Sequence, residues 1–404
     1  MSDTCAELPK KTFASAVKAA TLGAMALLAG CMNAPIYEGP SGQERVIEPV
    51  ATGQTIGGGQ VHVALLLPYS GQMQGSASVA STFENAARMA LADFQGADIK
   101  LLVKDTQGTQ AGAEFAAQAA IAEGAELIIG PVYSQAVRGA SMVARRSNVP
   151  IIGFSSDTNV AAPGTYLLSF LPESDVNRIV SFAHEQERSS YAALLPNNSY
   201  GAVVEAAFRQ AVGRVGGRIV TIERYAPGNA EDIRARVNNL SSIVSQVDSL
   251  YIPEGGGVPP FVMQVLTEKG ASTGAVKLLG SGLWNTSDMM KTPVMAGSWF
   301  PAPDNSNYDR FAGRYQQAYG VAPPRNASLA YDATILAAGL VRSAGMDRFS
   351  QRVLTNADGF LGIDGVFRFQ PNGRNERGLA IYEINGRGDA KVASPAPRTF
   401  SKHF

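Results

Sequence analysis

Unbroken apolar runs of strand length alternate with alanine-rich stretches of helical length through the first half of the chain. The run VHVALLLP at Val61–Pro68 is followed by a helical pattern around Ser78–Phe94 and by a second run, IKLLVKD, at Ile99–Asp105. Neither run alternates between apolar and polar residues, which is expected of strands that helices cover on both faces. The succession continues with helical patterns at about Gln110–Glu123 and Ser134–Arg146 and with apolar runs beginning at Glu126 and Val149. Repeated strand–helix units of this kind predict a parallel, doubly wound sheet.

The same rhythm restarts after LPESD at Leu171–Asp175. Helical patterns are expected up to Arg188, from Ala202 and from Glu231. The apolar runs between and after them are YAALLPNNSYG, GRIVTIERY, VDSLYIPEG and VKLLGSG. The chain has 404 residues, of which 45% are hydrophobic and 17% charged, so it is long enough to bury the cores of two lobes. Two similar sheets in one chain predict a cleft between them.

The N-terminal pattern is that of an exported, lipid-anchored protein. Lys10, Lys11 and Lys18 lead into an uncharged run, AATLGAMALLA, which is short for a bilayer span and is typical of a signal peptide. The run ends in LLAGC, Leu27–Cys31. This segment resembles the bacterial lipobox, in which the cysteine is lipidated and becomes the new N-terminus. An ordinary secretory signal with a chance cysteine is the alternative.

Processing at the lipobox would remove residues 1–30 together with Cys5, leaving Cys31 lipidated and no cysteine pair for a disulfide. Residue 32 is Met, whereas Asp at this place in bacterial lipoproteins generally favours retention in the inner membrane. The resemblance therefore predicts the outer membrane. Residues 31–59 are rich in Gly, Pro and polar residues without periodicity, and they are expected to form a flexible tether.

The charge balance gives no reason to expect a nucleic-acid partner. The whole chain has 34 basic and 34 acidic residues, and three of the basic and two of the acidic ones lie within residues 1–30. The mature chain would therefore carry a net charge near minus one, without the basic excess that nucleic-acid binding needs.

The candidate binding residues lie in the loops that follow the expected strands, because ligands of doubly wound sheets bind outside the carboxyl ends of the strands. These loops are rich in Ser, Thr, Asn, Tyr and Gly, which suit hydrogen bonding to a small polar ligand. The candidates for the cleft are Ser70, Ser134, Ser155, Ser156, Asp157, Tyr200, Tyr251 and Trp284. Helix capping is the alternative role for Ser134, aromatic packing for Tyr200, core packing for Tyr251 and lobe packing for Trp284.

The sequence contains few features that are typical of an enzyme. His62, His184 and His403 are the three histidines, and they belong to no metal-ligand spacing. The chain has no Gly-x-Ser-x-Gly elbow and no Walker loop, and its one Ser-x-x-Lys, Ser15–Lys18, lies in the expected signal peptide. We therefore expect no catalytic residue, no metal and no cofactor.

Several segments resemble known families in order and spacing. The segments VALLLPYSG, LIIGPVYS, VPIIGFSSDTN and NNSYG are similar to the branched-chain amino-acid-binding family of periplasmic proteins, and this resemblance extends from Gln60 to about Ala393. The later segments GSGLWN, GSWFPAPD, YGVAPPRNASLAYDA and GIDGVFRFQPNGRNERGLAIYEI are similar to the lipoprotein activators of penicillin-binding proteins, whose carboxyl domain has the same fold.

The resemblance implies a two-lobed type 1 periplasmic-binding-protein fold, an α/β architecture in which each lobe is a doubly wound parallel sheet and a hinge joins the lobes. The chain would cross between lobes near Leu171, Pro301 and Met346. The expected organisation is a signal peptide at 1–30, a tether at 31–59, a first lobe at 60–172 and 301–346, a second lobe at 173–300 and 347–393, and a tail at 394–404.

The resemblance also suggests a function. Amino-acid binders of the family hold the ligand carboxylate with a serine at the place of Ser134 and a hydroxyl residue about where Asp157 stands here. Two like charges about 4 Å apart repel by roughly 4 kcal/mol at an effective dielectric near 20. Asp157 therefore disfavours an amino-acid ligand, unless a shift of register brings Ser156 or Thr158 to that place.

We accordingly expect a non-enzymatic lipoprotein of the outer membrane that binds and activates a peptidoglycan synthase, a bifunctional penicillin-binding protein. The alternative is the solute-binding component of an ABC-type amino-acid uptake system, with a small polar ligand in the cleft. The enterobacterial activator carries a helical-repeat domain before this fold, whereas this chain has only the tether. The contact surface of that activator therefore cannot be transferred to this chain.

Overall fold

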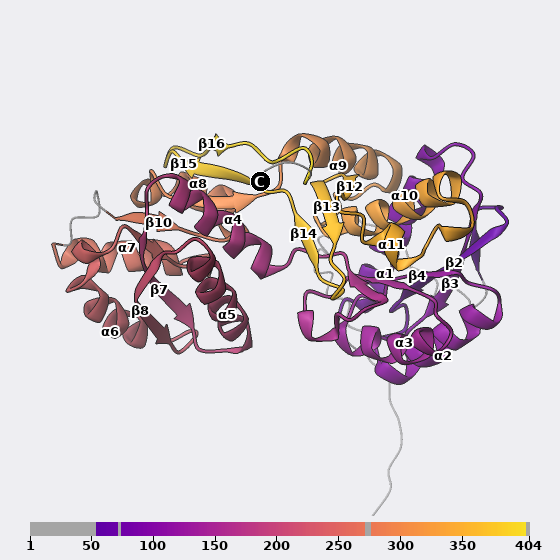
Figure 1. The fold of residues 1–404 in the computed structure, drawn as a ribbon. Helices are drawn as coiled ribbons and strands as arrows, with labels where there is room; N and C mark the ends of the chain where they lie inside the picture. Colours follow the sequence, from indigo (N-terminus) through magenta and orange to yellow (C-terminus); the bar gives the residue numbers. More distant parts are fainter. Residues whose placement is uncertain (1–53, 72–73, 271–275, 401–404) are drawn as a thin grey trace, which may run out of the picture. The chain divides into compact units, whose positions relative to one another are not determined.

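Two sheets of mostly parallel strands organise the computed structural model, which describes residues 54–71, 74–270 and 276–400 (Figure 1). All of these residues lie in one unit of the chain, Pro49–Phe404. The expected signal peptide, Cys31 with its expected lipidation, and most of the expected tether lie outside the described residues. No helix among the residues described combines the length and the apolar character that a membrane span requires.

The first sheet has the strand order β1-β3-β2-β4-β5-β6, and all of its strands run parallel except β1. Its strands are β1 (Thr55–Ile56), β2 (Val61–Leu67), β3 (Ile99–Asp105), β4 (Leu127–Ile129), β5 (Ile151–Gly153) and β6 (Thr165–Leu167). Its helices are α1 (Ser76–Asp93), α2 (Gln110–Ala122), α3 (Ser134–Arg146), α9 (Asn305–Tyr319), α10 (Ala327–Ser343) and α11 (Gln351–Leu354).

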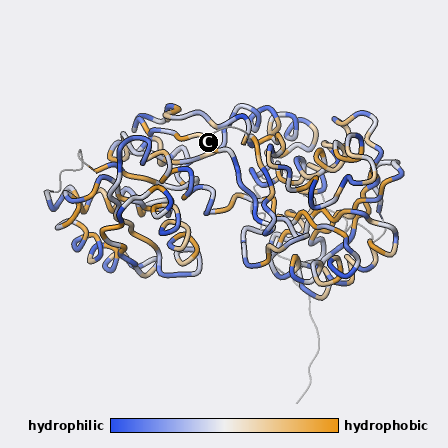
Figure 2. The backbone as a smooth tube through the Cα atoms, viewed as in Figure 1, coloured by the Kyte–Doolittle hydropathy of each residue, from blue (hydrophilic) through white to orange (hydrophobic). Residues whose placement is uncertain are grey.

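The apolar run of β2 explains why helices cover this sheet on both faces. Val63 and Leu65 belong to a core shared with α1 and α10, whereas Ala64 and Leu66 belong to a second core with α2 and α3. Successive side chains of a strand point to opposite faces, so an uninterrupted apolar run needs an apolar partner on each side. In Figure 2 the hydrophobic stretches of the tube run along the strands of the sheets.

The second sheet has the strand order β16-β15-β11-β10-β9-β7-β8, in which the strands from β11 to β8 are parallel. Its strands are β7 (Ser190–Pro196), β8 (Arg218–Tyr225), β9 (Ser249–Tyr251), β10 (Lys277–Leu279), β11 (Trp299–Ala302), β15 (Ala380–Ile384) and β16 (Ala390–Ser394). Its helices are α4 (Pro172–Glu185), α5 (Ser199–Arg214), α6 (Ala230–Ser241), α7 (Val258–Glu268) and α8 (Ser287–Lys291).

This second sheet is also covered on both faces. Ala193 and Leu195 of β7 pack in a core with α4 and α5, and Ala192 and Leu194 pack in a core with α6 and α7. The described residues also form short 3-10 helices in the connections between these elements. They are η1 (Thr158–Val160), η2 (Val244–Gln246), η3 (Gly282–Trp284), η4 (Pro293–Met295) and η5 (Gly345–Asp347). The two doubly wound sheets that the hydrophobic pattern predicted are therefore confirmed.

Two parts of the expected organisation differ in the structure. Thr55–Ile56, within the expected tether, forms β1 and pairs antiparallel with Leu101 and Leu102 of β3. Strand β1 has only two residues, which is too short for any periodicity to appear in the sequence.

The third crossing between the halves of the chain also falls later than Met346. A small antiparallel sheet, β12 (Phe360–Gly362), β13 (Gly365–Phe369) and β14 (Asn375–Arg377), follows α11. Phe367 and Phe369 of β13 lie in the core of the first lobe, and the chain joins the second sheet only at β15. The burial of these phenylalanines against the first lobe explains why this segment stays with it.

Candidate functional site

Three of the predicted binding residues in the first lobe form hydrogen bonds with other residues of that lobe. The backbone N–H and the hydroxyl of Ser70 both donate to the carboxylate of Asp105, which joins the ends of β2 and β3. Ser155 is buried and its hydroxyl accepts from the backbone N–H of Asp157 at 3.1 Å. Asp157 in turn accepts from the backbone N–H of Asn159 at 3.0 Å, where it caps η1. These contacts shape the loops.

Ser134 is the first residue of α3, so it does not stand at the N-cap position that the alternative role required. Tyr133 stands at the N-cap position, and no side chain caps this helix. Ser134 itself is half-buried.

Tyr251 and Trp284 belong to the core. Tyr251 is fully buried and its ring stacks on Phe208, with the ring centroids 5.1 Å apart. Trp284 is fully buried, and its indole N–H donates to the backbone oxygen of Glu254 at 2.9 Å. A Cβ at Gly280 would lie 2.1 Å from the indole, so a glycine is required beside this ring. The packing roles considered for both aromatics are the ones that the structure gives them.

A cavity of about 340 Å³ lies where the chain segments that join the two sheets come together. Its lining comes from the loop after β5, the start of α4, the first turn of α5, η3, the end of β11, the loop before α10 and the end of β14. The lining residues are Ser156, Phe170, Leu171, Pro172, Ser174, Asp175, Tyr200, Gly282, Leu283, Asn285, Ala302, Pro303, Arg325, Arg377 and Leu379. Both lobes contribute to it, and it contains two of the predicted candidates, Ser156 and Tyr200.

Tyr200 is held at the edge of this cavity by its hydroxyl. The hydroxyl donates to the backbone oxygen of Pro253 at 3.3 Å. Burial, with further contributions from Asp175 and Glu254, raises the pKa of Tyr200 to about 12. The phenol is therefore neutral at physiological pH and acts as a hydrogen-bonding group.

Asp175 is the acidic group of the cavity. It is partly buried in the first turn of α4 and accepts the backbone N–H of Gly282 at 2.8 Å. Burial raises its pKa from 3.8 to about 7, although the Gly282 hydrogen bond acts in the opposite direction. At neutral pH the carboxyl group is therefore present in both protonation states, as a donor and as an acceptor.

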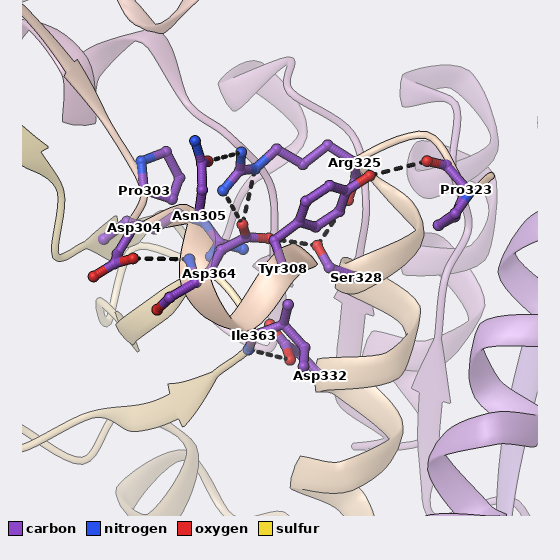
Figure 3. A network of polar contacts seen from close by, with 12 residues as sticks. Pro303, Asp304, Asn305, Tyr308, Pro323, Arg325, Ser328, Asp332, Ile363 and Asp364 are labelled. Atoms are coloured by element: carbon purple, nitrogen blue, oxygen red, sulfur yellow. Dashed lines mark hydrogen bonds and ion pairs between the residues drawn. The ribbon is translucent and has the colours of Figure 1, made fainter. Parts of the chain in front are cut away.

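Arg325 is neutralised inside a polar network (Figure 3). Its Nε donates to Asp364 at 2.8 Å and its Nη1 donates to Asn305 at 2.7 Å. Asp364 is fully buried and also accepts from the hydroxyl of Ser328 at 2.5 Å. The ring of Tyr308 lies 4.7 Å from the guanidinium. The network joins α9 and α10 to the turn between β12 and β13 beside the cavity.

The positive charge of Arg377, unlike that of Arg325, has no carboxylate among its hydrogen-bond partners in the described residues. Arg377 is only 4% exposed, its Nε donates to the backbone oxygen of Ser169 at 3.0 Å, and the ring of Phe170 lies 4.6 Å from its guanidinium carbon. Its Nη1 and Nη2 have no hydrogen-bond partner among the described residues. Burial lowers the pKa of Arg377, and Asp364 and Asp332 raise it.

Asp175, Arg325 and Arg377 were not among the binding residues predicted from the sequence. Each lies within a segment that was singled out for other reasons, as LPESD, YGVAPPRNASLAYDA and the long segment around β13 and β14. Their contribution depends on how the connecting segments meet, for which a strand–helix pattern gives no signal. Among the described residues no cluster of His, Cys, Asp and Glu could hold a metal ion.

The chain matches the periplasmic binding protein family over residues 60–390, so it belongs to this family. A putative branched-chain amino acid ABC transporter protein from Rhodospirillum rubrum is similar in structure, with a TM-score of 0.71 and 20% identity over 82% of this chain and 99% of that chain. A leucine-binding protein from Thermotoga maritima has a TM-score of 0.54 and 18% identity over 83% and 98%.

A third similar structure is an ABC transporter solute-binding protein from R. palustris in complex with benzoate. It has a TM-score of 0.54 and 19% identity, and the match covers 85% of this chain and 97% of that chain. None of the curated proteins matches this chain.

These comparisons confirm the two-lobed type 1 periplasmic-binding-protein fold and the resemblance to the branched-chain amino-acid-binding family. Members of the family are generally non-enzymatic ligand binders of the periplasm. The expected role as an activator of a penicillin-binding protein finds no support in these matches, which favour the solute-binding alternative.

Proposed function

We propose that this protein is the solute-binding component of an ABC-type uptake system. The observation that carries the proposal is the cavity of about 340 Å³ that both lobes line. The solute-binding proteins that this chain resembles include one solved with benzoate and one with 3,4-dihydroxy benzoic acid. A small solute is therefore the ligand class proposed here.

The lining of the cavity suits a small solute with an apolar body and a few polar groups. Phe170, Leu283 and Leu379 offer apolar surface, and Asp175 and Tyr200 offer hydrogen-bonding groups. The solute would contact both lobes at once. Binding would therefore favour the arrangement of the lobes in which both sets of contacts are made.

A thermal-unfolding screen of the purified full-length chain against small organic acids, amino acids and neutral solutes tests this proposal. A solute at 100 times its Kd stabilises the folded state by about 2.7 kcal/mol. We expect at least one solute to raise the Tm, and Tyr200→Ala to weaken its binding. Phe115→Ala is the matched control, because Phe115 is exposed on α2 and does not line the cavity. A screen in which no solute shifts the Tm contradicts the proposal.

We further propose that Cys31 carries the lipid that anchors the protein at the periplasmic face of the outer membrane. The lipobox-like segment Leu27–Cys31 supports this proposal. Cell fractionation of the Cys31→Ser variant tests it, since the variant should leave the membrane fraction for the soluble periplasmic fraction. Sedimentation of Cys31→Ser with the outer membrane would show that the anchor lies elsewhere.

The activator role can be tested against the solute-binding role in one experiment. The bifunctional penicillin-binding proteins of the source organism would be mixed with the full-length chain, and glycan polymerisation would be measured. The solute-binding account predicts an unchanged rate. A reproducible rise in rate, together with capture of one synthase by the chain, would favour the activator instead.

A further inference from the structure

A second cavity, of about 360 Å³, lies on α4, α5 and the small sheet, and four arginines line it. Arg178 comes from α4, Arg214 from α5, Arg368 from β13 and Arg377 from β14. The one acidic residue in the lining is Glu376. The cavity shares Ser174, Arg377 and Leu379 with the solute cavity, but its other arginines do not line that cavity.

Only one of these arginines is paired with the acid of the cavity. The guanidinium of Arg368 forms an ion pair with Glu376 at 2.7 Å. Arg178 instead donates to two neutral acceptors, the backbone oxygen of Leu379 at 2.8 Å and the hydroxyl of Ser394 at 2.6 Å.

Arg214 and Arg377 likewise have neutral hydrogen-bond acceptors, the amide oxygen of Asn177 for Arg214 and the backbone oxygen of Ser169 for Arg377. These bonds fix the positions of the guanidinium groups but do not offset their charge. The cavity therefore gathers guanidinium groups that are already held in place. The carboxylates that act on Arg178 and Arg377 through their charge, Glu185, Asp332 and Asp364, do not line it.

Arg377 supplies donors that lack hydrogen-bond partners. The residue is 4% exposed, and its Nη1 and Nη2 are buried without a hydrogen-bond partner among the described residues, while the carboxylates of Asp364 and Asp332 act on the guanidinium through their charge. A buried charged group without a partner is costly, and proteins normally pair such groups or bind a counter-charge. The planar fork of a guanidinium matches the oxygens of an oxyanion, so an oxyanion that reached the buried Nη1 and Nη2 would satisfy both nitrogens.

We propose that this cavity is a binding site for a small oxyanion with two or more negative charges, held by Arg377, Arg214 and Arg178. Several guanidinium groups from different elements suit a multiply charged ligand better than a monovalent one. The site goes beyond the proposed solute cavity, because it takes a different class of ligand. Since α4 and α5 belong to the second lobe and β14 packs with the first, the anion would tie the two lobes together at their connection.

Isothermal titration of the full-length chain with inorganic phosphate, pyrophosphate and citrate, at constant ionic strength, tests the site. The three probes distinguish a phosphate group from a polycarboxylate. We expect one of them to bind with a stoichiometry of one. The Arg377→Met and Arg214→Met variants should each weaken that binding by about tenfold, the loss expected for a charged hydrogen bond.

The Arg214→Met variant keeps the experiment decisive if Arg377→Met fails to fold, because Arg214 is exposed. Arg209→Met is the matched control, since Arg209 is also exposed on α5 but pairs with Glu205 and does not line the cavity. The proposal is overturned if none of the probes binds at millimolar concentration. It is also overturned if Arg209→Met weakens binding as much as Arg214→Met does, because the binding would then reflect general surface charge. Neither result would affect the binding of a solute in the first cavity.

Discussion

The raised pKa of Asp175 makes a measurable contribution to the pH dependence of stability. Burial moves this pKa from 3.8 to about 7 in the folded protein, so the folded state holds a proton that the unfolded state releases at lower pH. Stability from this group is therefore fully present below pH 4, and it is lost as the pH rises to about 7. The difference between a pKa of 3.8 in the unfolded chain and about 7 in the folded protein corresponds to about 4 kcal/mol.

The Asp175→Asn variant removes the titration and keeps an oxygen that can accept the N–H of Gly282. Urea unfolding of both proteins between pH 4 and pH 8 measures the difference in free energy of unfolding. We expect the variant to gain on the wild type by up to about 4 kcal/mol as the pH rises across this range. Asp347→Asn is the control, because Asp347 is exposed and forms only a surface ion pair with Arg352. A difference between wild type and Asp175→Asn that stays constant with pH would refute the reasoning.

Two further predictions concern the packing around the cavity. Arg325→Met should lower the free energy of unfolding by about 3 to 5 kcal/mol, because it leaves the fully buried Asp364 without its cation. Arg352→Met, at an exposed pair, should cost at most about 1 kcal/mol, and equal losses in thermal unfolding would contradict the assignment. Gly280→Ala should cost about 1 to 3 kcal/mol by crowding Trp284, and an unchanged Tm would show that the indole can move aside.

The hydrophobic pattern predicted the two doubly wound sheets, because most of their parallel strands are buried on both faces, whereas the edge strand β8 is only partly buried. The apolar run at β2 and the helical pattern of α3 both appear in the structure where the sequence placed them. Strand β1 was not predicted, since a two-residue strand forms only through its pairing with β3.

The candidate site was predicted only in part. The topology predicted the site in the loops after the strands, and of the predicted residues Ser156 and Tyr200 line the cavity. The topology could not distinguish cleft residues from core residues, because a strand end is close to both. Tyr251 and Trp284 were predicted as cleft candidates and lie in the core. Asp175 and Arg377 lie on the segments that connect the sheets, and their burial arises only when those segments pack together.

Equilibrium binding of the identified solute to the Leu283→Trp variant tests the central claim most directly. Leu283 lines the cavity and is 52% exposed, so a larger side chain there should fill the cavity without disturbing the core. Met346→Trp is the control, because Met346 is 91% exposed and does not line the cavity. The account predicts that Leu283→Trp loses binding while Met346→Trp binds as the wild type does. Wild-type affinity in Leu283→Trp would contradict the placement of the solute in this cavity.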